Sequence, residues 1–414
     1  MVNGKFAATI TELKQEREMI WIHDTQLLLV PKYVFRKDMN ANIGFFMHSP
    51  FPSSDIYKMF PYRGEVLKSL LSCNLIGFHL FEYARNFYTA CRRILGLTHE
   101  FKKGGFLAIE SFGRSVMIRI SHIGIMEEDI VEATEKETHL QFVKQLQVSQ
   151  LQKKRNVIAS IDRLHPISGL KNKFLAYQKF LRDNPLHRSA TTLIQYVVPS
   201  EWPALTPNSG SQLITNQTKS DIYELIKEIE EEFGKSSITY IEQDLTMEQR
   251  MGLWASANIL LITTLRDGQC LPPLEFITVR KHLGKANKSA VILSEFSGCN
   301  RALGGVLRIN PFNVEEIAKN IATAITMQAE EREQRFKIAY NYISKHSTLK
   351  WAEAFLKDMK RSHQPRGDGL NEYMIIGFGL NQTIIKTRQG FKELKDGYVE
   401  LNYNRSCNRL IIID

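Results

Sequence analysis

Short apolar runs alternate along the chain with longer amphipathic segments, which is the pattern of a parallel α/β fold. The apolar runs predict strands at 19–22, 43–48, 75–78, 117–120, 157–161, 193–198, 259–263, 290–293 and 306–309. Apolar residues at helical spacing predict helices at 65–71, 82–95, 171–183, 219–233, 314–331 and 349–361. The fold class expected from this alternation is α/β.

Breaks in the pattern suggest how the chain is organised. The segment 124–154 is polar and has helical character, so we interpret it as the hinge between two Rossmann-like halves. Residues 200–216 are rich in Pro, Ser, Gly, Thr and Asn and predict a long surface loop. Residues 364–369 have the composition of a linker, and the strand-like pieces that follow end at 410–413.

The composition is that of a globular protein. The chain has 414 residues, of which 43% are hydrophobic and 24% charged, and this excludes a disordered chain or a disulfide scaffold. No apolar run approaches the ~18 residues that span a bilayer, and the first twenty residues are too charged for a signal peptide. The 5 cysteines form no CxxC pair, which argues against a zinc site. We therefore expect a cytoplasmic protein without a membrane partner.

The basic net charge of +10 raises the question of nucleic-acid binding. The densest basic stretch is Arg280, Lys281, Lys285 and Lys288, and no aromatic residues are interleaved with it. A second cluster, at 153–155, is very short. Solvated loops, or a mild field that favours anionic small ligands, explain the charge better, so no nucleic-acid partner is expected.

Polar residues at the ends of four predicted strands suggest a ligand site. Open α/β sheets bind ligands at the carboxyl ends of their strands. The endings are His23-Asp24, His48-Ser49, Asp162-Arg163 and Arg266-Asp267-Gly268, the last followed by a helix that holds Glu275. Any one of them has a plainer explanation, as a helix cap or a buried polar contact. Two in each half predict a cleft enzyme.

Several longer strings carry a family resemblance. They are WIHD, GFFMHSPFPSSDIYK, LIGFHLFEYARNF, LRDGQCLPPLEF, LSEFSGC and INPFN. Together they resemble the trehalose-6-phosphate synthase family of retaining glycosyltransferases. The resemblance implies a GT-B-like α/β fold, in which two Rossmann-like domains face a cleft and a C-terminal helix crosses back. It also implies transfer of glucose from UDP-glucose to glucose 6-phosphate, with retention and with neither a metal nor another cofactor.

The resemblance also implies a division of the chain into parts. Residues 1–125 correspond to an incomplete N-terminal Rossmann-like domain on the acceptor side, and 126–348 to the domain that binds the nucleotide sugar. Residues 349–363 correspond to the helix that crosses back. The strings NEYMIIGFGL and RLIIID resemble the tail of two-domain members, so 364–414 is interpreted as a linker and the start of a truncated phosphatase-like domain. Both ends therefore look truncated.

Family roles fall on named residues of this chain. A metal-free transferase must neutralise the leaving UDP with cationic side chains and helix N-terminal amides. The resemblance gives catalytic roles to Asp24, His48 and Asp267, with Asp24 on the acceptor. UDP-glucose contacts fall on His48, on Arg163 at the diphosphate, on Asp267 at the glucose hydroxyls, on the Leu271 backbone at the diphosphate, and on Glu275 at the ribose.

Departures from the family pattern bear on activity. Ser168 stands where a lysine usually contacts the diphosphate, although Lys171 or Lys173 could reach in from the next helix. Glu201 aligns with an arginine that binds the acceptor phosphate, and Pro272-Pro273 removes amides from a helix start. The sequence therefore predicts a synthase-like domain of weak or no activity.

Two alternatives stay open. One is a non-catalytic regulatory or scaffold protein of trehalose metabolism that binds a sugar nucleotide or sugar phosphate. Such a protein would associate with itself or with an active synthase. The other is a GT-B transferase with a different acceptor, which would explain the altered acceptor side but not the missing lysine.

Overall fold

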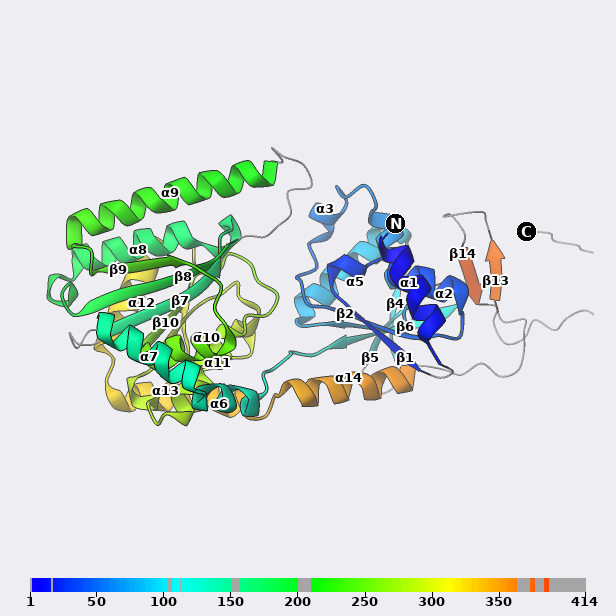
Figure 1. Cartoon of the computed structure of the whole chain (residues 1–414). Helices are drawn as coiled ribbons and strands as arrows, with labels where there is room; N and C mark the ends of the chain where they lie inside the picture. The colour runs from blue at the N-terminus through cyan, green and yellow to red at the C-terminus, as the bar shows by residue number, and fades with distance from the viewer. Residues whose placement is uncertain are drawn as a thin grey trace, which may run out of the picture.

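The chain forms two α/β halves side by side, each built on a six-stranded sheet (Figure 1). This computed structural model describes residues 2–15, 18–102, 106–111, 113–150, 156–199, 210–362, 373–376 and 383–386. A two-stranded antiparallel sheet of β13 (Tyr373–Ile376) and β14 (Thr383–Lys386) follows the second half. The features predicted at 153–155, 201, 364–369 and 410–413 lie outside the described residues.

The N-terminal sheet has the strand order β1-β2-β3-β6-β5-β4. Its strands are β1 (Met19–His23), β2 (Asn42–Met47), β3 (Leu75–Phe78), β4 (His99–Lys102), β5 (Phe106–Ser111) and β6 (Arg114–Ile120). The first three and β6 are parallel, whereas β5 is antiparallel to both of its neighbours. Strands β2 and β3 are buried along their whole length, because helices cover both faces of the sheet, and their sequences are therefore continuous apolar runs.

Helices from both ends of the described chain cover this sheet. Those from its own half are α1 (Val2–Leu13), α2 (Val30–Lys37), α3 (Ser54–Tyr57), α4 (Arg63–Leu70) and α5 (Phe81–Leu95), with a 3₁₀ turn at Thr25–Leu27. Helix α14 (Thr348–Ser362) returns from the second half and packs Phe355 and Met359 against the opposite face (Figure 1). Gly44 and Gly77 allow this approach, since a Cβ atom at either position would overlap α14 side chains or Phe46. The helix predicted to cross back is thus confirmed.

The C-terminal sheet is parallel throughout, with the order β12-β11-β10-β7-β8-β9. Its strands are β7 (Asn156–Arg163), β8 (Thr191–Val198), β9 (Ile238–Glu242), β10 (Ile259–Ile262), β11 (Ala290–Ser294) and β12 (Leu307–Ile309). One hydrophobic core lies under α8 (Leu170–Asp183), α9 (Gly210–Phe233) and α12 (Val314–Thr326). The core on the other face lies under α6 (Glu127–Glu135), α7 (Glu137–Gln150), α10 (Met247–Ser256), α11 (Pro272–His282) and α13 (Ala329–Ile343). Short 3₁₀ turns lie at Pro166–Ser168, Pro185–His187, Ala286–Lys288 and Gly298–Arg301.

Three predictions about the elements were wrong. Helix α9 already begins at Gly210, inside the predicted loop, because a formed helix extends more easily than a new one starts. The helix predicted at 314–331 is two helices, since Met327 and Gln328 adopt extended ψ angles of 134° and 153° between them. The segment 124–154 has the predicted helical character, but its interpretation as a hinge was wrong, because α6 and α7 pack on α10 and α11 within the C-terminal half.

The connection between the halves is a pair of adjacent chain segments. Ile125 and Ser347 form a parallel bridge, and the Thr348 hydroxyl donates to the Gly124 carbonyl over 2.9 Å. Gly124 lies so close to the His346 carbonyl that a Cβ atom there would overlap it. Among the helices that the structure describes, none is long and apolar enough to cross a membrane.

Candidate functional site

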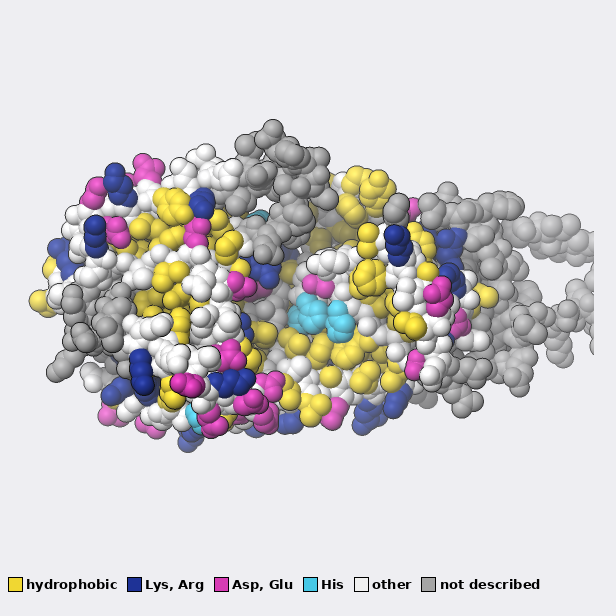
Figure 2. All heavy atoms as spheres, viewed as in Figure 1, with side chains coloured by type: hydrophobic (Ala, Val, Ile, Leu, Met, Phe, Trp, Pro, Cys, Tyr) yellow, Lys and Arg dark blue, Asp and Glu magenta, His cyan; other side chains and the backbone are white. Residues whose placement is uncertain are grey.

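The strand ends identified from the sequence meet where the two halves touch. Gly268 packs directly on the His48 carbonyl, and a side chain at position 268 would overlap that oxygen. The Tyr83 hydroxyl, from α5, donates a hydrogen bond of 2.9 Å to the Asp267 carbonyl. In Figure 2, histidine side chains lie together on the visible face of the N-terminal half, beside its border with the C-terminal half. The structure therefore brings the loop after β10 to the end of β2.

Asp24 is held in a strained conformation. Its φ of 58° with ψ of −175° is the only positive φ among the non-glycine residues that the structure describes. Such a conformation costs ~1–3 kcal/mol and is common at functional sites. Two hydrogen bonds to Asp24 Oδ1, of 3.2 Å from the Ser49 amide and 2.9 Å from the Ser49 hydroxyl, fix the carboxylate. Asp24 is thus aimed by the loop that follows β2.

Three histidines at the ends of β1, β2 and β3 form a hydrogen-bonded chain. His23 Nδ1 lies 3.1 Å from His48 Nε2, and His48 Nδ1 lies 3.2 Å from His79 Nε2. Burial lowers the pKa of all three rings, to about 3 for His79, and like charge on the neighbouring imidazole adds to this at His23 and His79. The Asp24 carboxylate opposes the shift at His23 and His48. The N-terminal part of the site is therefore built from neutral imidazoles at pH 7.

Asp267 and Arg163 stand at the ends of neighbouring strands of the other sheet. Burial raises the pKa of Asp267, while the Gly268 amide, the Cys270 thiol and the Arg163 guanidinium act in the opposite direction. Arg163 is exposed, and no hydrogen bond joins its guanidinium to the described residues. This arrangement leaves a cation available to an anionic ligand, with the half-buried Asp267 carboxylate within its electrostatic influence.

The two lysines that could have replaced the missing cation have other partners. Lys173 is fully buried and bonds Asp162 and Ser160, with Gln195 Oε1 at 3.2 Å. Lys171 forms an ion pair of 2.8 Å with Asp221. The expectation that one of them reaches the diphosphate position is therefore not met, because the buried Asp162 carboxylate requires Lys173 as its counterion.

Glu275 is bound by residues of the neighbouring helix. Its Oε2 accepts hydrogen bonds from Arg250 Nε at 2.9 Å and from Trp254 Nε1 at 3.1 Å. Within the described chain no hydrogen bond reaches its Oε1 atom. Arg250 and Trp254 are spaced i, i+4 on α10, a pattern that the sequence contains, but only the packing of α10 on α11 shows what they face.

The start of α11 offers few amides to an anion. Pro272 and Pro273 have no N–H, and the amides of Leu274 and Glu275 already donate to the Leu271 carbonyl over 2.9 and 3.1 Å. The Leu271 amide donates to none of the described residues. A diphosphate contact at this helix start is thus reduced to the Leu271 backbone.

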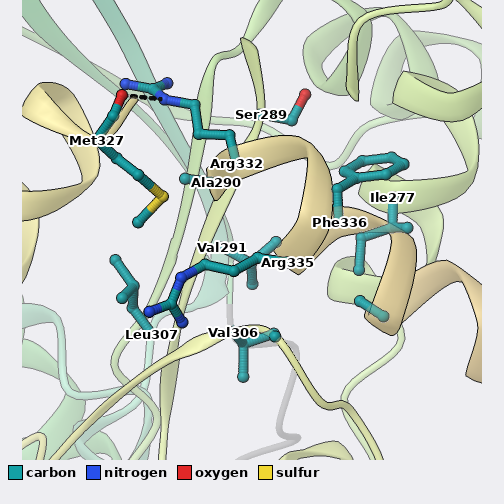
Figure 3. A pocket seen from close by; sticks show the side chains of 12 residues that line it. Ile277, Ser289, Ala290, Val291, Val306, Leu307, Met327, Arg332, Arg335 and Phe336 are labelled. Atoms are coloured by element: carbon teal, nitrogen blue, oxygen red, sulfur yellow. Dashed lines mark hydrogen bonds between the residues drawn. The ribbon is translucent and has the colours of Figure 1, made fainter. Parts of the chain in front are cut away.

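One pocket of the C-terminal half lies apart from these strand ends. A small pocket among α11, β11, β12 and α13 is lined mainly by apolar residues such as Ile277, Val291 and Phe336 (Figure 3). Its two arginines are engaged, Arg332 with the Met327 carbonyl and Arg335 with Glu331. Among the described residues, no group of three or more His, Cys, Asp or Glu is placed to hold a metal ion.

Two Rossmann-like sheets whose strand ends face each other, with a final helix that returns to the first, define the GT-B class of glycosyltransferases. Comparison with known proteins gives the family. The sequence model of Glycosyltransferase family 20 matches residues 1–361, so the chain belongs to that family. The sequence strings predicted this family and a GT-B-like α/β fold, and both predictions are confirmed.

Individual relatives agree with this membership. An Arabidopsis thaliana protein, alpha,alpha-trehalose-phosphate synthase [UDP-forming] 6, is 32% identical over all of this chain and 49% of its own length. The chain thus spans about half the length of this relative. The N-terminal domain of a Candida albicans trehalose-6-phosphate phosphatase superposes with a TM-score of 0.78 at 27% identity, covering 87% of this chain and 74% of that one. An E. coli trehalose-6-phosphate structure bound with UDP-2-fluoro glucose gives 0.77 at 25% identity, covering 88% and 78%.

Proposed function

We propose that this chain is a trehalose-6-phosphate synthase-type glycosyltransferase domain that binds UDP-glucose, takes glucose 6-phosphate as acceptor, and has weak or no turnover. The observation that carries the proposal is the junction of the halves, where Gly268 packs on His48 and Tyr83 holds the Asp267 carbonyl. The E. coli neighbour is described with a UDP-glucose analogue, and the plant relative as a UDP-forming synthase. Both descriptions fit a donor site at this junction.

Each candidate residue has a chemical role in this proposal. Arg163 neutralises charge that grows on the leaving diphosphate, without a metal, and the Leu271 amide donates to the same group. The Asp267 carboxylate accepts hydrogen bonds from glucose hydroxyls. Glu275 turns Oε1 to the ribose while Arg250 holds Oε2. On the other half, Asp24 orients the attacking hydroxyl of the acceptor and His48 lines the glucose.

Weak turnover follows from the missing positive charge. Ser168 is buried in a short 3₁₀ turn, and both nearby lysines have acidic partners. The loss of one donor to a developing oxyanion typically costs ~10²–10³ in rate. The paired state of these lysines also favours the second candidate, a non-catalytic regulatory protein that holds a sugar nucleotide. The similarity to the N-terminal domain of a phosphatase supports this candidate.

Calorimetry with UDP and UDP-glucose tests the donor site. Glu275→Ala should abolish binding, while Ser168→Lys should strengthen it by about one to two decades, as for one charge-assisted hydrogen bond. Glu330→Ala, at an exposed position of α13, is the matched control and should change nothing. Affinity that ignores both Glu275 and Ser168 would place the nucleotide elsewhere.

A second measurement separates the enzyme from the binding protein. UDP release from UDP-glucose is followed with and without glucose 6-phosphate, for the native chain and for Ser168→Lys. Acceptor-dependent release by the variant alone would identify the missing cation as the main defect. Fast release by the native chain would contradict the weak-turnover proposal, whereas no release from either, with binding intact, would favour the regulatory candidate.

A further inference from the structure

The turn after β7 carries an exposed histidine beside the exposed Arg163. Arg163 ends the strand, the next residue, Leu164, is buried, and His165 is exposed again. The His165 amide donates to the Arg163 carbonyl over 2.8 Å, which keeps the two residues close together at the strand end. The proposed function assigns the diphosphate to Arg163. His165 therefore lies next to the place proposed for the anionic part of the ligand.

The turn that carries His165 is fixed to the loop after β10. His165 precedes the 3₁₀ turn Pro166–Ser168 and has an extended backbone, with φ of −151° and ψ of 143°. The carbonyl of Ile167, inside this turn, accepts a hydrogen bond of 2.7 Å from the Leu265 amide. Leu265 lies two residues before Asp267 in the chain. His165 is thus held against the same loop that brings Asp267 to the junction of the halves.

A backbone hydrogen bond fixes which ring nitrogen of His165 carries the hydrogen. The Ile167 amide donates to His165 Nδ1 over 3.2 Å, so the imidazole caps the start of the turn. Because a backbone amide can only donate, Nδ1 presents a lone pair and the single ring hydrogen lies on Nε2. Within the part of the chain that the structure describes, no hydrogen bond reaches Nε2. His165 therefore offers an N–H donor to a ligand.

A donor at this position partly replaces the cation that is missing from the turn. Ser168 is buried, and Lys173 and Lys171 form ion pairs with acidic side chains. Hydrogen bonds to phosphate oxygens are strong because the acceptor is charged. The imidazole can thus hold a diphosphate beside Arg163. It supplies an N–H rather than a full positive charge, which fits a chain that binds a nucleotide and turns it over slowly.

We propose that His165 Nε2 donates a hydrogen bond to the diphosphate of the nucleotide sugar, beside Arg163. The inference rests on the proposed function and adds one residue to its donor site. The contact is made to phosphate oxygens, so UDP and UDP-glucose gain affinity from it. Uridine, which has no phosphate, gains nothing.

Two substitutions keep the cap of the turn and remove the donor. His165→Asn and His165→Asp each retain a side-chain oxygen that can accept from the Ile167 amide, as cap residues commonly do. Calorimetry with UDP should show about ten- to hundredfold weaker binding for His165→Asn, as for one hydrogen bond to a charged group. His165→Asp should weaken UDP further, because it adds a negative charge. Uridine should bind equally to all three chains. His282→Asn, at an exposed position of α11, is the control and should change neither ligand.

Ring-nitrogen NMR of ¹⁵N-histidine protein tests the geometry of the contact directly. The native chain should show His165 with its hydrogen on Nε2. Addition of UDP should shift the Nε2 resonance of His165, whereas addition of uridine should leave it in place. A native His165 with its hydrogen on Nδ1, or an Nε2 resonance that ignores UDP at saturation, would overturn the inference.

Failure of this inference can be distinguished from failure of the proposed function. A native chain that binds UDP, with the same affinity in His165→Asn, contradicts the inference alone. A native chain that binds neither UDP nor UDP-glucose contradicts the proposed function and, with it, the diphosphate contact of His165. Equal losses of UDP and uridine affinity in His165→Asn would show that the variant disturbs the nucleotide site as a whole, and would overturn a contact made to the diphosphate.

Discussion

The two sides of the site use different chemistry for the same task of placing polar groups at strand ends. On the N-terminal side, three neutral imidazoles are joined by hydrogen bonds of 3.1 and 3.2 Å, and one strained aspartate is held by Ser49. On the C-terminal side, full charges dominate, in the buried Lys173–Asp162 pair, the Arg250–Glu275 pair and the exposed Arg163. Neutral polar groups suit sugar hydroxyls, and a charged surface suits a diphosphate. Under the proposed function, the charged side would hold the diphosphate, and sugar hydroxyls would meet polar groups of both sides.

The largest effect on stability is expected at the buried Lys173–Asp162 pair of the C-terminal side. Lys173→Met leaves the Asp162 carboxylate buried without its counterion, which typically costs 3–5 kcal/mol, so ~3–5 kcal/mol of unfolding free energy should be lost. Denaturant unfolding measures this. Lys171→Met is the control, since its exposed pair with Asp221 contributes only ~0–1 kcal/mol. Equal losses of unfolding free energy in the two variants would contradict the claim that the buried Lys173–Asp162 pair matters more to stability than the exposed Lys171–Asp221 pair.

The junction between the sides should be the next most sensitive point. A side chain at Gly268 would overlap the His48 carbonyl, so Gly268→Val must push the halves apart. Moving the Asp267 carboxylate out of reach removes a charge-assisted hydrogen bond of ~1.5–3 kcal/mol, so UDP-glucose affinity should fall by about one to two decades. Calorimetry and small-angle scattering measure the two effects. Gly64→Ala, where a Cβ atom meets nothing within 4 Å, should leave both unchanged.

Acid should lower the free energy of unfolding through the buried His79 on the N-terminal side. The pKa of His79 is about 3 in the folded chain and 6.5 in its ordinary state, so below pH 6.5 the unfolded chain binds the extra proton. The free energy of unfolding therefore falls as pH falls below 6.5, by ~2 kcal/mol for this residue between pH 7 and 5. In denaturant titrations, His79→Gln should remove this part of the fall in unfolding free energy between pH 7 and pH 5. His282→Gln, at an exposed position of α11, should leave it intact.

The smallest effect concerns the hydrogen bond that joins the sides. Tyr83→Phe removes the donor to the Asp267 carbonyl, and a hydrogen bond of this kind contributes ~0.5–1.5 kcal/mol. UDP-glucose affinity should fall between about two- and tenfold, because the loop that carries Asp267 loses one support. The exposed Tyr62 gives the matched variant Tyr62→Phe, for which no change is expected.

Much of the fold was predictable because each buried parallel strand is a continuous apolar run. The strand at 75–78 was predicted with its observed ends, and all the strands predicted at 19–309 are present within a few residues. Strands β4 and β5 were missed, since both belong to an antiparallel excursion at the sheet edge. Strand β9 was missed because its residues are only half-buried. A continuous apolar run indicates a strand that is buried on both faces. Strands that are less buried lack such a run and are harder to predict from the sequence.

The site was predictable only in part. Strand-end position was enough to select His23, Asp24 and His48, and the structure brings them together. His79 stands at the end of β3 in the same way, and the repeated ending of three adjacent strands in histidine was a usable signal. The partners of Lys171 and Lys173 could not be predicted, because sequence spacing does not show whether a lysine points to solvent or into a core. Tyr83 and Arg250 act across element boundaries and were missed for that reason.

The paired connection between the halves limits how they can move. A body joined to another by one flexible strand can swing and twist freely. Two segments bridged side by side at Ile125 and Ser347 hinder twisting of one half against the other. The loop that carries Asp267 is held by the Tyr83 hydrogen bond and also by a hydrogen bond of 3.2 Å from Gln269 Nε2 to the Ile123 carbonyl, next to this bridge. The connection between the halves and the loop that carries Asp267 are thus joined to one another, so the relative placement of the two halves is fixed partly by the site itself.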